Sequence, residues 1–211
     1  MISMIGINIE IVLGEFLDMK LKVKSFFYLR FSPSFDLMVA LSTEILVILI
    51  HYMGTRVINP TLHFVIYNII LSMVLTVIVP VLYIVVLKQQ PLASLGIKKH
   101  LLTVALILSI VFSCLSIKVV SDSLPILSFA HLNLLLGGIN LWKPLFFYGW
   151  LQLRFENALG SILGMILAGI CFGLYHIGTL PVDMILPLIG IGIIYGGLFR
   201  LAGNNLLVLF P

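Results

Sequence analysis

Apolar runs long enough to cross a lipid bilayer recur along this chain. Residues 62–87, for example, contain no Asp, Glu, Lys or Arg. A spanning α-helix needs about 20 mainly apolar residues, and it satisfies its own backbone polar groups inside the lipid. The chain is 61% hydrophobic and 9% charged, whereas soluble domains carry about 25% charged residues. The sequence therefore predicts an all-α, polytopic transmembrane helical bundle.

We expect about six to seven spanning helices, which form a single transmembrane domain over residues 31–211. The segments of full length are residues 36–53, 62–87, 101–120, 127–153, 158–177 and 181–199. A further segment begins near Asn205 and reaches the last residue of the sequence, Pro211.

Residues 1–30 have a different character, because basic and apolar residues alternate near their end. Lys20, Lys22, Lys24 and Arg30 would face anionic lipid headgroups, so we expect an amphipathic, basic segment on the membrane surface. Basic residues between the later segments fall mainly on the same side as these four. By the positive-inside rule this predicts a multi-pass protein of the cell membrane with a cytoplasmic N-terminus. The net charge of +4 is therefore no sign of nucleic-acid binding.

Glycines spaced four residues apart predict how the later helices pack. Such pairs leave a flat strip on which the backbone of a neighbouring helix can approach closely. The pairs are Gly160 with Gly164, Gly169 with Gly173, and Gly192 with Gly196. The two cysteines, Cys114 and Cys171, lie in apolar runs and are interpreted as small packing residues.

Three ionisable residues are the clearest cases within expected spans: Glu44, Lys143 and, near the end of its span, His176. Each costs roughly 2.5–3.5 kcal/mol to insert, so each is a functional candidate. A salt bridge between Lys143 and Glu44 is the structural alternative. Other polar residues are explained by exposure at helix ends, namely His51, His100, Glu156 and Asp183. His63 and His131 lie near segment starts and stay ambiguous.

Two short motifs lie in the second half of the chain. The stretch KPLFFYGWLQLRFENALGS, residues 143–161, has the frame of an EExxxR motif that runs on through Phe147 and Gly149. Downstream, Phe172 and His176 match FxxxH. With PLASLGIKK and AGNNLLVLFP, these segments resemble the CPBP family of membrane-embedded CAAX proteases and bacteriocin-processing (Abi) proteins, relatives of the Rce1-type prenyl protease. The resemblance covers about residues 90–211.

The resemblance implies an intramembrane metalloendopeptidase that uses a glutamate pair and metal-binding histidines. Here Lys143 and Pro144 stand at the glutamate positions, and Tyr148 stands in place of the arginine. A lysine ammonium has no acceptor and proline has no side-chain chemistry, so this pair cannot take a proton or hold a cation. The third motif, with a further histidine, is expected by alignment just after Pro211.

The family implies zinc as a cofactor, with Phe172 and His176 as the retained motif residues and His176 as the metal ligand. A catalytic zinc normally takes three protein ligands. Glu44 or His131 could supply another, and the spacing favours neither.

The sequence leaves three hypotheses about function open. The first is a CPBP-like intramembrane metalloendopeptidase whose catalysis is impaired, in effect a pseudoenzyme. The second is a non-catalytic membrane binding or bacteriocin-immunity protein. The third is a small transporter subunit, with Glu44, Lys143 and His176 along a polar path; no inverted repeat supports it. The expected partners are the lipid bilayer and a membrane-associated peptide or a prenylated or bacteriocin-type protein.

Overall fold

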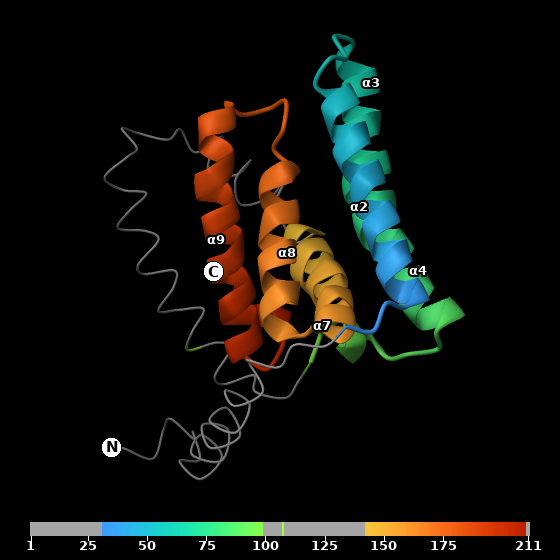
Figure 1. The fold of residues 1–211 in the computed structure, drawn as a ribbon. Coiled ribbons are helices and arrows are strands. Elements are labelled where there is room, and N and C mark those ends of the chain that lie inside the picture. The colour runs from blue at the N-terminus through green and yellow to red at the C-terminus, as the bar shows by residue number, and fades with distance from the viewer. Residues whose placement is uncertain (1–30, 99–106, 108–141, 210–211) are drawn as a thin grey trace, which may run out of the picture.

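The computed structural model describes residues 31–98, 107 and 142–209, and every regular element in these residues is a helix. Figure 1 shows two helical hairpins with one further helix packed between them. The expected all-α fold is therefore confirmed for the described residues. Outside the described residues lie the surface segment 1–30, the expected span 101–120 apart from residue 107, and the part of the expected span 127–153 before residue 142, together with Cys114, His100 and His131.

The first hairpin pairs α2 (Phe35–Gly54) with a continuous helical run. This run consists of α3 (Pro60–Phe64), η2 (Val65–Ile78), α4 (Val79–Leu82) and η3 (Tyr83–Leu87), of which η2 and η3 are wound as wider π-type helix. Ser34 caps α2, because its side-chain oxygen accepts a hydrogen bond from the Leu37 amide at 3.3 Å. The two long apolar segments that the sequence predicts here are confirmed.

Asn59 starts the second helix of this hairpin. Its side-chain oxygen accepts hydrogen bonds from the amides of Thr61 at 3.0 Å and Leu62 at 3.1 Å. These amides have no acceptor inside the helix, so the cap satisfies them.

We expect Asn59→Ala to lower the melting temperature of the detergent-solubilised protein, because the free energy of unfolding falls by about 1 kcal/mol when the cap is lost. Asn59→Asp keeps the acceptor and is the matched control; equal losses in both variants would contradict the role of the cap.

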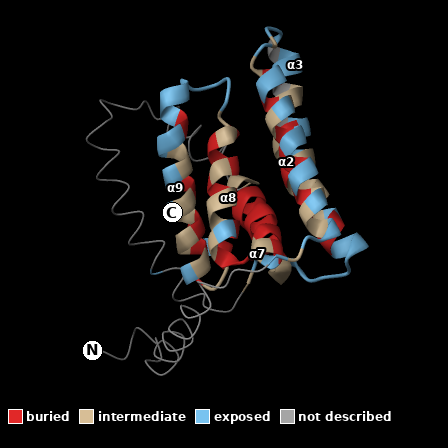
Figure 2. Cartoon of the chain, viewed as in Figure 1, coloured by how far each residue is buried: buried red, intermediate tan, exposed pale blue. Residues whose placement is uncertain are grey.

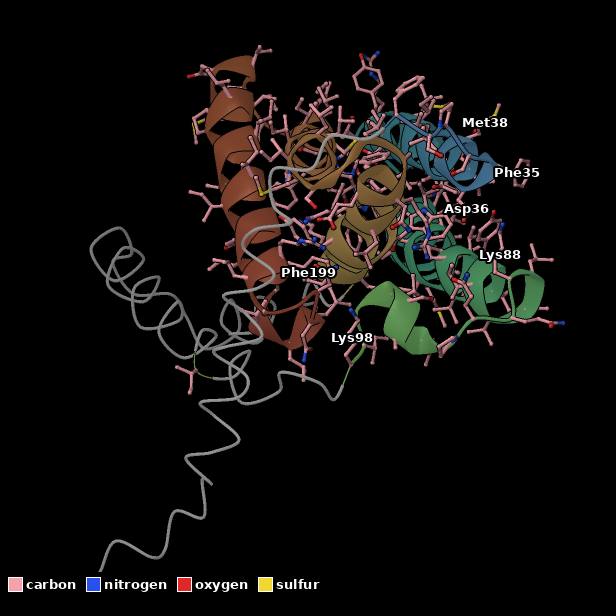
Figure 3. All side chains as sticks on the ribbon, turned by 60° about the horizontal axis from the view of Figure 1, so that its bottom comes forward. Phe35, Asp36, Met38, Lys88, Lys98 and Phe199 are labelled. Carbon is pink, nitrogen blue, oxygen red and sulfur yellow. The ribbon has the colours of Figure 1, made fainter. Side chains whose placement is uncertain are left out.

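An ion pair joins the start of the first helix of this hairpin to the end of the second. Lys88, directly after η3, contacts the Asp36 carboxylate at 2.7 Å. Figure 3 labels both side chains near the start of α2. The hydrogen bond to Asp36 raises the pKa of Lys88, which lies outside the apolar helix. Both side chains are about one third exposed, so the pair positions the helix ends and adds little stability.

The central helix consists of η5 (Pro144–Gln152) and α7 (Leu153–Leu159). It is the most buried part of the described chain, as Figure 2 shows, because residues 145–155 are all buried. It ends at Gly160, whose φ of +92° is open to glycine and rarely to other residues. The sequence predicts that a span ends at residue 153, which is wrong by six residues.

The second hairpin consists of α8 (Ser161–Leu174) and α9 (Val182–Leu201), which pack side by side (Figure 1). Glycines lie at their contact: a Cβ on Gly192 would stand 2.9 Å from Gly169 Cα, and one on Gly169 would stand 2.8 Å from Ile193 N. The close helix approach predicted from the paired glycines is therefore confirmed for Gly169 and Gly192.

Two segments that are far apart in the sequence meet beside η5 of the central helix. The Leu206 amide donates to Gly96 O at 2.9 Å, and Lys98, labelled in Figure 3, donates to Gly203 O at 3.1 Å. Residues 92–95 and 206–209 each form a short 3₁₀ helix, η4 (Leu92–Leu95) and η6 (Leu206–Leu209). The sequence predicts that a further spanning segment begins near Asn205. In the structure the described residues after Asn205 form only the short 3₁₀ helix η6.

Three helices in the described part are long and apolar enough to cross a membrane. They are Phe35–Gly54, Thr61–Leu87 and Val182–Leu201, and α8 is a shorter apolar helix. Their exposed apolar side chains, such as Met38 and Leu186, face outward, where lipid would cover them. The chain is therefore a helical membrane protein with at least these candidate spans.

Candidate functional site

The first motif lies at the start of the central helix. Pro144 is the first residue of η5, and Trp142 and Lys143 directly before it are also helical. Lys143 precedes it and projects its ammonium over two aromatic rings. Its Nζ lies 5.6 Å from the centroid of the Trp142 ring and 5.4 Å from that of Tyr175. These cation–π contacts hold the lysine half-buried among aromatic side chains.

The salt bridge that the sequence suggests between Lys143 and Glu44 does not form. Glu44 is 3% exposed on α2, and its carboxyl lies beside the Cys171 thiol of α8. Neither carboxyl oxygen has a hydrogen-bond partner of good geometry among the described residues. The interpretation of Cys171 as a buried packing residue is confirmed, since the thiol is free and buried.

His176 follows α8 and turns back on its own helix. Its Nδ1 lies 2.9 Å from the backbone oxygen of Phe172, which can only accept, so Nδ1 carries the proton and Nε2 the lone pair. The rings of Phe172 and His176 are 5.3 Å apart, and Phe172 also packs on Phe147 of η5 at 5.3 Å. The two motif segments, KPxxF and FxxxH, are therefore in contact through the Phe147 and Phe172 rings.

Tyr148 occupies the motif position of the arginine and points into the bundle. It is 1% exposed, and its ring packs 6.3 Å from Tyr195 and 6.3 Å from Phe199. Its hydroxyl has no hydrogen-bond partner among the described residues. A phenol in this place fills apolar space and supplies no positive charge.

His51 is the site residue that sequence reasoning misses. We expect it to be exposed at a helix end, yet it is 4% exposed. Its ring lies 4.1 Å from Tyr175 and 5.1 Å from Tyr67, and within the described part of the chain neither ring nitrogen has a partner. The signal was its spacing: Glu44 and His51 are seven residues apart, which places both on one face of α2.

Glu156 is also buried, where the sequence predicts an exposed helix end. It accepts a hydrogen bond from Gln152 Nε2 at 2.8 Å and pairs with Arg200 of α9 at 3.0 Å. Gln152 also donates to Gly196 O at 3.1 Å. These bonds tie the central helix to α9 and so position the motif at its far end. Asp183, the other acid expected at a helix end, is exposed as predicted.

The described residues do not assemble a metal site. No group of three His, Cys, Asp or Glu side chains comes together within residues 31–98 and 142–209. His176 offers one free nitrogen, but the Lys143 ammonium close by repels cations. Glu44 lies beside Cys171, away from the lysine, and His131 is outside the described residues. The donor set present therefore does not fit zinc.

Comparison with known proteins tests the family suggested by the motifs. A family model described as type II CAAX prenyl endopeptidase Rce1-like matches residues 125–210, which is less than half of the 211 residues. Comparison with curated proteins and with solved structures gave no match. The match includes both motifs and leaves out α2, which carries Glu44 and His51. Over residues 125–210 this membrane protein therefore carries an Rce1-like segment, which matches the family suspected from the motifs.

Proposed function

We propose that this protein is a catalytically impaired, Rce1-like membrane protein that binds a membrane-associated ligand without cutting a peptide bond. By the resemblance the ligand is a peptide or a prenylated or bacteriocin-type protein, and a role in bacteriocin immunity is the variant of this proposal without any processing. We also propose the cell membrane as its location, with a cytoplasmic N-terminus.

One observation carries the proposal, namely the environment of Lys143. Hydrolysis needs a group that accepts a proton from water or a metal that lowers the pKa of water. At the first motif the side chains present are an ammonium packed on two aromatic rings and a proline. Glu44, a buried acid of the described bundle, faces the thiol of Cys171. The first motif thus lacks a group that activates water, and the neighbouring imidazole of His176, whose Nε2 carries a lone pair, is the base that the test below removes.

The test is a cleavage assay on the whole chain in liposomes. Two reporters are used, a prenylated peptide and an unprenylated membrane-spanning peptide, with zinc added or chelated. We expect no cleavage above that in protein-free liposomes in either condition. The matched control is His176→Ala, which should behave like the unchanged protein. Cleavage that the unchanged protein supports and His176→Ala abolishes would contradict the proposed function.

A further inference from the structure

Two hydrogen-bond donors from different parts of the chain converge on one aromatic ring, that of Tyr175. Lys143 Nζ lies 5.4 Å from the centroid of this ring, and the His51 ring lies 4.1 Å from it. His51 comes from α2, outside the Rce1-like segment, so the pair is a feature of the assembled bundle.

Neither donor has an anionic partner among the described residues. Each acid in this part of the chain is otherwise placed: Asp36 pairs with Lys88, Glu156 pairs with Arg200, Glu44 lies beside Cys171, and Asp183 is exposed at the start of α9. His51 is nonetheless only 4% exposed, and neither of its ring nitrogens has a hydrogen-bond partner among the described residues. A buried imidazole without a partner is costly unless a ligand completes its hydrogen bonds.

The chemistry of this cluster matches one carboxylate. An ammonium and one imidazole N–H provide a single positive charge and two donors, and a carboxylate offers one negative charge and two acceptor oxygens. A phosphate prefers several donors, with arginine forks foremost. Arg56, in the turn after the helix that carries His51, is engaged by the Tyr52 hydroxyl and ring. His176 adds no donor, because its N–H is bonded to Phe172.

The surroundings of the donors are apolar, which sets the rest of the ligand. Trp142 and Tyr175 flank the ammonium, and Phe147 and Phe172 continue the aromatic surface along η5 and α8. We infer that Lys143 and His51 bind the carboxylate of a single-chain amphiphile, of which a fatty acid is the simplest form. The inference rests on the proposed function, because it names the class of ligand that the same site takes.

The experiment measures binding of radiolabelled palmitate to the whole chain in nanodiscs, with empty nanodiscs as background. Unlabelled palmitate, palmitamide and lysophosphatidate serve as competitors. Palmitamide has the same chain without the charge, and we expect it to compete at least about tenfold more weakly than palmitate. Equal competition by palmitamide would overturn carboxylate recognition, and tighter binding of lysophosphatidate would assign the site to phosphate.

Variants then test the residues. Lys143→Gln should weaken palmitate binding at least about tenfold, whereas Lys143→Arg keeps the charge and should stay within about threefold. Lys88→Gln, at the opposite end of the bundle, is the matched lysine control and should bind like the unchanged protein. Unchanged binding in Lys143→Gln would overturn the inference. Cleavage of the reporter peptides by a palmitate-binding protein would contradict the proposed function alone, and absence of both activities would contradict only this inference.

Discussion

Glu156→Ala is expected to lower the free energy of unfolding by about 3 kcal/mol. The Glu156 side chain is 6% exposed, and it is bonded to both Gln152 and Arg200. Removal of the carboxylate leaves the half-buried guanidinium of Arg200 without this ion pair and removes one acceptor from Gln152. Breaking a buried pair by removal of one partner is among the costliest single changes.

The measurement is equilibrium unfolding in mixed micelles, with helix content followed by circular dichroism. Asp183→Ala is the matched control, because this acid is exposed at the start of α9. We expect its effect to stay within about 0.5 kcal/mol. Similar losses in the two variants would show that Glu156 does not hold the central helix to α9.

Gly192→Ala is expected to destabilise the protein by about 2 kcal/mol. The added Cβ would stand 2.9 Å from Gly169 Cα and 3.0 Å from Gly169 O. Both are backbone atoms, which cannot turn aside as a side chain can, so α8 and α9 must separate. A small separation forfeits van der Waals contact along the whole pair, and such contact is the main attraction between helices in lipid.

Gly190→Ala is the control on the same helix. A Cβ there meets no atom within 4 Å. Alanine is the better helix former, so we expect Gly190→Ala to be neutral or to stabilise by up to about 1 kcal/mol. The same unfolding assay compares the two variants. Loss of equal size in Gly190→Ala would attribute the effect to the loss of glycine in general, and not to the helix contact.

Much of the first hairpin and of α9 could be predicted from the sequence. Long runs without charge admit few alternatives to a helix, and the expected span 36–53 agrees with Phe35–Gly54 to within one residue at each end. The expected span 181–199 likewise agrees with Val182–Leu201 to within two residues. The paired glycines correctly predict which faces of α8 and α9 meet, because only glycine permits that approach.

The end of the central helix could not be predicted from the sequence, because charged residues at the end of an apolar run usually indicate that the chain has left the membrane. Arg154 and Glu156 are charged, yet both are bonded inside the bundle: the Arg154 guanidinium stacks 5.1 Å from Trp150, and Glu156 pairs with Arg200. Partners that lie far apart in the sequence decide whether a charge can be buried. The residues of one segment do not show which distant residue will pair with a charged side chain.

The motifs name only part of the side chains that meet around Tyr175. The motifs brought Lys143, Phe172 and His176 into consideration, and the structure places all three around Tyr175 and its neighbours. His51 was missed because a histidine near a helix end is usually explained by exposure. Its burial depends on Tyr67, which lies on η2, and on Tyr175, which lies in the turn after α8.

The central proposal is that the Rce1-like site holds no zinc, because Lys143 and Pro144 stand where the family resemblance implies acids. The most direct test is the zinc content of the purified protein, loaded with zinc and washed, beside that of His176→Ala. The account predicts the same low zinc content in both samples, well below one ion per chain. One zinc per chain that disappears in His176→Ala would contradict the account.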